Sequence, residues 1–116
     1  MMFLYINDMR KTLLLATSLI ALLVPVAQAG TPTRASVRIV DIGDTSKYTP
    51  SRVTIRKGGT VTWTWSHTHL HNVYGPGLNS GMVKSSGRWV HQFTQAGTYN
   101  YFCSAHSYMK GVVIVR

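Results

Sequence analysis

YNYFCSAHSYMKG, at residues 99–111, places a cysteine, a histidine and a methionine three residues apart between two runs of β-forming residues. The three residues are Cys103, His106 and Met109, which give the pattern Cys-x2-His-x2-Met. A loop that leaves one strand and enters the next can bring three such side chains around one point. Their thiolate, imidazole and thioether groups form a soft set of metal ligands.

This ligand set suits copper in both oxidation states, because thiolate and thioether satisfy Cu(I) and imidazole satisfies Cu(II). A trigonal copper site of two histidines and one cysteine, with a weak axial methionine, needs one further histidine. His71 is the favoured residue, because it stands far upstream of Cys103 at the expected start of a short strand. The sequence therefore predicts one copper ion held by His71, Cys103, His106 and Met109.

Two more histidines, His67 and His69, precede His71 in the same polar segment. They are most simply solvated loop residues, since histidines in loops commonly face water. Two other interpretations remain open: they form an auxiliary copper-capturing site, or one of them is the true upstream ligand in place of His71. If the segment is extended, His69 and His71 point the same way.

Other chemistries fit the cysteine segment less well. A buried cysteine and methionine are common without any metal, but their order with His106 after a strand favours a metal site. A Cys–His protease pair needs a substrate cleft that so short a chain has little room for, and it gives Met109 no role. Zinc prefers ligands other than thioether.

Outward from this segment, the chain shows short β-rich runs separated by turn residues, with no convincing helical pattern. Val61–Trp65 alternates large and small residues, while Thr98–Phe102 and Gly111–Val115 flank the cysteine segment. We expect residues 66–71 to form a loop that ends in a short strand at residues 72 and 73. The pattern predicts an all-β fold, a Greek-key β-sandwich of about seven to eight strands.

The first 29 residues are typical of a secretory signal peptide. Arg10 and Lys11 precede an apolar run of about 14 residues, shorter than the roughly 20 of a membrane span, and Ala27-Gln28-Ala29 fits a cleavage site. Met9 would be a more usual start than Met1. We expect cleavage near Ala29, a single domain at residues 30–116, and export to a periplasm or the cell exterior without stable membrane insertion.

Charge and cysteine content narrow the function further. The chain has 12 Lys and Arg against 3 Asp and Glu, a formal charge of +9, which favours a partner with an acidic surface. Nucleic acid is not expected, because the basic residues are scattered and the chain is predicted to be exported. Its single cysteine cannot form an intramolecular disulfide, so a metal is the expected second stabiliser of a small exported domain.

Nearly all of residues 30–116 resemble the plastocyanin and amicyanin group of cupredoxins. The matching residues include Tyr48-x-Pro50, Val61-x-Trp63, His71-Asn72-Val73, Gly97-Thr98-Tyr99-x-Tyr101-x-Cys103, His106 and Met109-Lys110-Gly111, and the short Cys-x2-His-x2-Met spacing is closer to amicyanin. The resemblance implies the cupredoxin fold, a type 1 (blue) copper ion with the four ligands named above, and single-electron transfer without enzymatic activity. It also implies that Asn72 and Ser104 brace the site and that His106 is the electron-transfer port.

Two other functions stay open at this point. One is copper storage or delivery outside the cytoplasm, without electron transfer, and the other is a metal-free interaction domain. The expected partners of an electron carrier are a donor and an acceptor redox protein, which the chain would meet as a monomer. A surface patch of Leu70, Pro76 and Tyr108 near the ligands would suit such brief encounters.

Overall fold

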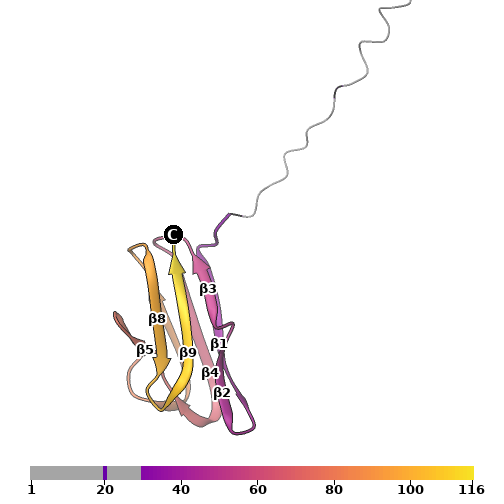
Figure 1. Ribbon diagram of the computed structural model, residues 1–116, viewed down its shortest axis with the longest axis vertical. Coiled ribbons are helices and arrows are strands. Elements are labelled where there is room, and N and C mark those ends of the chain that lie inside the picture. The colour runs from indigo at the N-terminus through magenta and orange to yellow at the C-terminus, as the bar shows by residue number, and fades with distance from the viewer. Residues whose placement is uncertain (1–19, 21–29) are drawn as a thin grey trace, which may run out of the picture.

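The computed structural model describes residue 20 and residues 30–116, so the predicted signal peptide lies outside the described part except for that one position. Residues 30–116 form nine strands in two sheets, without a helix (Figure 1). Within the described residues, no helix has the length and apolar character needed to cross a membrane. The strands are β1 Arg34–Ile42, β2 Thr45–Thr49, β3 Arg52–Ile55, β4 Thr60–His71, β5 Tyr74–Gly75, β6 Leu78–Asn79, β7 Lys84–Gln92, β8 Gly97–Cys103 and β9 His106–Val115.

The two sheets enclose one hydrophobic core, which confirms the predicted all-β sandwich. The four-stranded sheet has the order β2-β1-β4-β7, and the five-stranded sheet has the order β3-β9-β8-β5-β6. The pairs β1–β4 and β3–β9 are parallel, and the other pairs are antiparallel. The expected count of seven to eight strands is slightly low because β5 and β6 are only two residues long each.

Strand β4 supplies the centre of the core. Val61, Trp63 and Trp65 alternate inward and are almost fully buried, as their period of two predicts. The Tyr48 and Tyr101 rings complete this centre through edge contacts. The centre of the Tyr101 ring lies 5.4 Å from that of Trp63 and 4.7 Å from that of Tyr48. The aromatic cluster therefore ties β4 to β2 and β8 across the two sheets.

The prediction of a loop at residues 66–71 is wrong. Strand β4 continues through this segment to His71, with an irregular register against β7 between Ser66 and His71. The expected short strand at Asn72 and Val73 is also absent from the described residues, and the next strand begins at Tyr74. Pairing with β7 extends a strand whose polar sequence reads locally as a loop, and it carries His71 to the end of the sandwich.

Strands β8 and β9 form the hairpin that contains the cysteine segment (Figure 1). Cys103 is the last residue of β8 and pairs with His106, the first residue of β9, so the turn between them is tighter than the expected ligand loop. Met109 lies within β9. Gly111, on the same side of β9, leaves room for the Tyr101 ring, which a Cβ at that position would overlap. Met109 is thus buried in the same hydrophobic core as Tyr101.

Candidate metal centre

Three of the predicted ligand side chains meet at one end of the sandwich. One ligand atom each from His71, Cys103 and His106 lies within 4.8 Å of the other two. They come from the end of β4, the end of β8 and the start of β9. The packing of the two sheets therefore brings together residues that are far apart in sequence. His71 and Cys103 are completely buried, while His106 is half-buried.

The spacing of these atoms fits a metal site. The Cys103 Sγ lies 3.7 Å from His106 Nδ1 and 4.0 Å from His71 Nδ1. Two ligands bonded at about 2.1 and 2.3 Å with an angle of about 120° lie roughly 3.8 Å apart. One thiolate and two imidazoles in this arrangement match the trigonal set that copper prefers in redox proteins.

Met109 is buried in the same hydrophobic cluster as Cys103. Its thioether is therefore shielded from water on the inner side of β9, where it can serve as a weak axial ligand or as core packing. Both roles are compatible with its burial, and the chemistry of the neighbouring donors favours the first.

The other two upstream histidines differ from His71. His69 is partly exposed, and its Nδ1 lies 3.3 Å from the Asp41 Oδ2 rather than among the three ligand atoms. The backbone of His67 lies within β4. Geometry therefore places His71, and not His69, beside the Cys103 sulfur.

Asp41 is a site residue that the sequence did not reveal. Its Oδ1 lies 2.9 Å from His71 Nε2, on the opposite side of the ring from Cys103. The only sequence signal was that Asp41 is one of two acidic residues after the predicted signal peptide, in a run of β-forming residues. Nothing in that run indicates that β1 would lie beside β4 in a parallel pair.

Asn72 connects the segment that carries His71 to the turn that follows Cys103, as the resemblance predicted. The Ser104 N–H donates to Asn72 Oδ1 at 2.8 Å, and Asn72 Nδ2 donates to Ser104 Oγ and to the Gly81 carbonyl, each at 3.1 Å. Because Asn72 is nearly buried, these bonds are little weakened by water. They hold the two ligand-bearing segments at a fixed separation.

Tyr48 of β2 also supports the segment that contains Asn72. Its hydroxyl donates a 2.6 Å hydrogen bond to the Asn72 carbonyl. Burial raises the pKa of Tyr48 above its ordinary value, and Cys103 and Tyr101 add to the shift, so the hydroxyl stays protonated and remains a donor.

Apolar side chains lie beside the exposed edge of the cluster. Leu70 is 49% exposed and its carbonyl lies 4.0 Å from Cys103 Sγ, while Tyr108 is 55% exposed and its ring centre lies 5.8 Å from that of His106. Pro76, the third residue of the expected patch, lines a hollow with residues 100–102, Lys110 and Gly111 instead. We therefore define the apolar rim as Leu70 and Tyr108.

Comparison with known proteins places this geometry in context. Residues 35–116 match the family model described as copper binding proteins, plastocyanin/azurin family. The chain is 36% identical to amicyanin-alpha of Methylorubrum extorquens over 60% of its own length, and it spans 65% of that relative, just under two thirds. It is 35% identical to amicyanin of Paracoccus versutus, over 79% of this chain and 73% of that one.

A solved structure shows the same likeness in three dimensions. The reduced Cu(I) form, at pH 4, of an amicyanin variant superimposes with a TM-score of 0.60 at 32% identity. The match covers 72% of this chain and 82% of the amicyanin.

Proposed function

Because the chain belongs to the plastocyanin/azurin family of copper-binding proteins, we propose that it is a blue-copper electron carrier and not an enzyme. The convergence of His71, Cys103 and His106 carries this proposal. Together with Met109, these residues would hold one copper ion. Bound copper supplies one-electron chemistry by alternating between Cu(II) and Cu(I).

The protein's contribution is to keep the ligands in place when an electron moves. His71 and Cys103 are buried at strand ends, and the hydrogen bonds of Asn72 fix the distance between their segments. When the ligands cannot move toward the coordination geometry that Cu(I) or Cu(II) prefers, few atoms change position as the electron is transferred. A stiff site with four protein ligands also leaves no open position for a substrate.

We assign the electron-transfer port to His106. It is the half-buried member of the cluster, whereas His71 and Cys103 have no exposed surface. The apolar rim of Leu70 and Tyr108 lets a partner approach this edge without stripping water from charged groups. Contact over a small apolar surface gives the short-lived complex that an electron shuttle needs.

Copper binding is tested directly by titrating the metal-free domain with Cu(II). We expect one equivalent to produce an intense visible absorption, and repeated reduction and reoxidation to return it without loss of metal. The measurements are the absorption spectrum and the copper content after each cycle. Weak absorption would contradict the blue-copper site, and transfer of Cu(I) to a chelating acceptor in each cycle would favour copper delivery.

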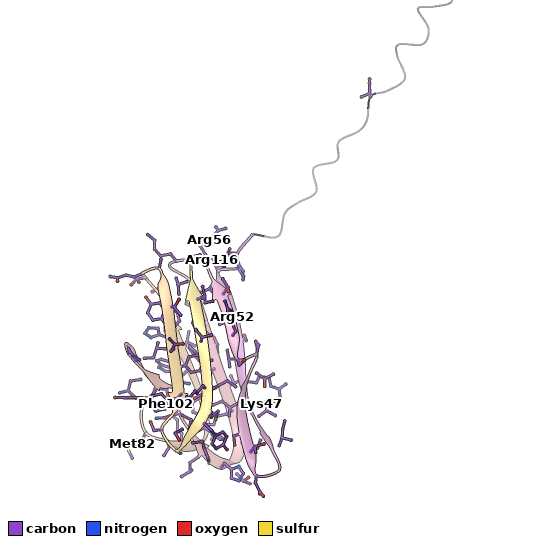
Figure 2. The ribbon with its side chains drawn as sticks, in the orientation of Figure 1. Lys47, Arg52, Arg56, Met82, Phe102 and Arg116 are labelled. Atoms are coloured by element: carbon purple, nitrogen blue, oxygen red, sulfur yellow. The ribbon has the colours of Figure 1, made fainter. Side chains whose placement is uncertain are left out.

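The donor and acceptor are proposed to be redox proteins with acidic surfaces, met outside the cytoplasm by a monomeric carrier. Residues 30–116 contain ten basic and two acidic residues. Figure 2 shows Arg56 and Arg116 at the end that carries the C-terminus, with Lys47 and Arg52 along the side of the sandwich. Positive charge thus lies at the end opposite His106 and along one side, and it attracts a negative partner to the molecule as a whole.

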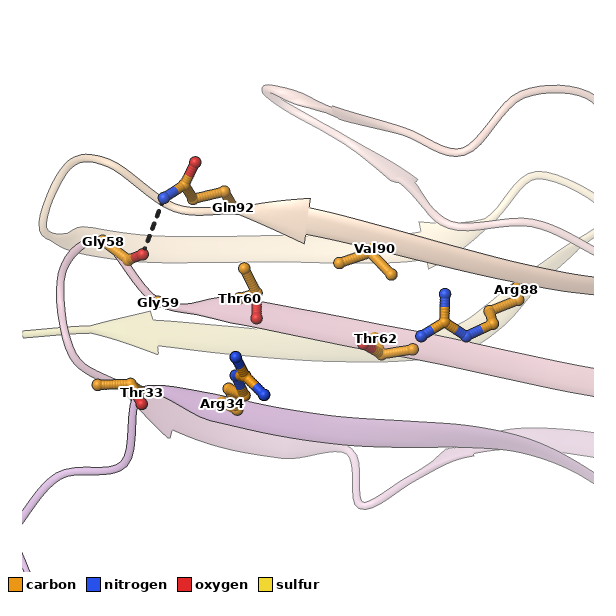
Figure 3. Close-up of a pocket in the computed structure, with 9 residues that line it drawn as sticks. All are labelled: Thr33, Arg34, Gly58, Gly59, Thr60, Thr62, Arg88, Val90 and Gln92. Carbon is orange, nitrogen blue, oxygen red and sulfur yellow. Dashed lines mark hydrogen bonds between the residues drawn. The ribbon is translucent and has the colours of Figure 1, made fainter.

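The outer face of the four-stranded sheet adds to this positive surface. Arg34 of β1 and Arg88 of β7 lie on either side of Thr60 and Thr62 of β4, around a shallow hollow (Figure 3). The only interaction drawn there is a 3.0 Å hydrogen bond from Gln92 Nε2 to the Gly58 carbonyl, which involves neither arginine. None of the residues that line this hollow is acidic.

Electrostatic steering gives a salt-dependent rate. We expect oxidation of the reduced copper protein by anionic hexacyanoferrate(III) to slow at least about threefold as ionic strength rises from about 0.01 to 0.15 M, because the screening length falls from about 30 to about 8 Å. Stopped-flow absorption measures the rate. A cationic cobalt(III) phenanthroline oxidant is the control and should be accelerated by salt. Equal salt dependence for both oxidants would remove the steering claim and leave the copper site intact.

A further inference from the structure

Both nitrogens of the His71 ring have a defined neighbour. Nδ1 faces the Cys103 Sγ at 4.0 Å, and Nε2 lies 2.9 Å from the Asp41 carboxylate. A carboxylate accepts hydrogen bonds, so in the neutral ring Nε2 carries the hydrogen and Nδ1 presents its lone pair toward the cysteine. The contact with Asp41 therefore selects the one neutral form of His71 that can bind a metal beside Cys103.

Asp41 itself lies against side chains of two other strands, and one of them donates a hydrogen bond to it. Ser46 of β2, which pairs with Asp41 in the β1–β2 hairpin, donates from its Oγ to Asp41 Oδ1 at 2.7 Å. The second oxygen, Oδ2, lies 3.3 Å from His69 Nδ1 of β4. The carboxylate is only 13% exposed, and Ser46 is almost buried. The hydrogen bond from Ser46 fixes the carboxylate behind His71, and the burial of the carboxylate limits the screening of its charge by water.

We propose that Asp41 is a positioning residue that orients His71 and favours Cu(II) over Cu(I), an inference that rests on the copper site proposed above. A carboxylate behind a ligating imidazole increases the donor strength of the ring. The same negative charge stabilises the more highly charged metal ion more strongly. Both effects act in one direction and lower the reduction potential of the bound copper.

The replacement Asp41→Asn tests this role, because it keeps the shape of the side chain and removes the charge. We expect Cu(II) affinity to fall about 10- to 100-fold, the range found when groups behind metal ligands are replaced, and Cu(I) affinity to change little. At 59 mV per tenfold change for one electron, the reduction potential rises by about 60–120 mV. Cyclic voltammetry measures the shift, and a potential unchanged within about 20 mV, well under one such tenfold step, would overturn the proposal.

Asp44→Asn is the matched control. Asp44 lies in the exposed turn between β1 and β2. Its replacement by asparagine removes the same unit of charge from the same region of the molecule. We expect the potential of this variant to stay close to that of the parent protein. An equal rise in both variants would assign the effect to overall charge and would contradict a specific role for Asp41.

A measurement on the metal-free parent protein tests orientation without any variant. Nitrogen-15 chemical shifts of His71 should show hydrogen on Nε2 and a free lone pair on Nδ1. The opposite form would overturn the proposal even if Asp41→Asn failed to fold. If the protein bound no copper, the function proposed above would fail while this test of Asp41 still stood. If copper bound normally and Asp41→Asn left the potential unchanged, only the Asp41 proposal would fail.

Discussion

Replacement of His71 by alanine is expected to abolish the intense visible absorption of the copper-loaded protein, whereas His69→Ala should retain it. The His71 Nδ1 is beside the Cys103 sulfur in a completely buried side chain, and alanine supplies no nitrogen donor in its place. His69 faces Asp41 instead. Loss of a direct ligand should weaken Cu(II) binding by more than about 100-fold, the upper range for indirect groups.

The comparison needs a check that both variants fold, because His71→Ala leaves a cavity and removes the hydrogen-bonding partner of Asp41. Circular dichroism of the metal-free proteins gives this check before copper is added. A colourless His69→Ala together with a blue His71→Ala would show that the upstream ligand is assigned to the wrong histidine. Loss of colour in both would point to a site that depends on the whole histidine segment.

The segment around the cysteine was predictable because its information is local. The spacing of Cys103, His106 and Met109 survives any small error in strand boundaries. Their soft donor set points to copper before any fold is known. The alternation of Val61, Trp63 and Trp65 is equally local, and their burial follows from it. Such features need no knowledge of which strands become neighbours.

Features that depend on strand pairing were missed. Residues 66–71 read as a loop because they are polar, but pairing with β7 keeps them in β4 and sets the position of His71. The contact between Asp41 and His71 exists because β1 lies beside β4 and the β1–β2 hairpin places Ser46 against the carboxylate. No periodicity in a single strand encodes a neighbour that arrives from elsewhere in the chain.

The second large expected effect concerns the core that supports the site. Trp63→Ala should lower the free energy of unfolding of the metal-free protein by about 3–5 kcal/mol, the usual cost of removing a buried tryptophan. Trp63 is completely buried, and its ring lies within 5.4 Å of Tyr101 and 5.1 Å of Trp89. Because the free energy of unfolding of a small domain is only about 5–15 kcal/mol, this loss is a large part of its stability.

Urea unfolding measures the effect, and Thr62→Ala is the matched control. Thr62 is the neighbour of Trp63 on β4 and points to the outer face of the sheet, so its replacement should cost less than about 1 kcal/mol. Similar losses in the two variants would contradict a core centred on Trp63.

Copper-loaded protein extends the same experiment to the site. A metal that binds only the folded state adds about 4.1 kcal/mol when its concentration is 1,000 times its dissociation constant. If Trp63 acts only through the core, copper should add the same increment to the parent protein and to Trp63→Ala. A smaller increment in the variant would mean that the aromatic cluster also holds the ligands. The path for that coupling is present, because Trp63 contacts Tyr101, Tyr101 contacts Tyr48, and Tyr48 donates to the Asn72 carbonyl.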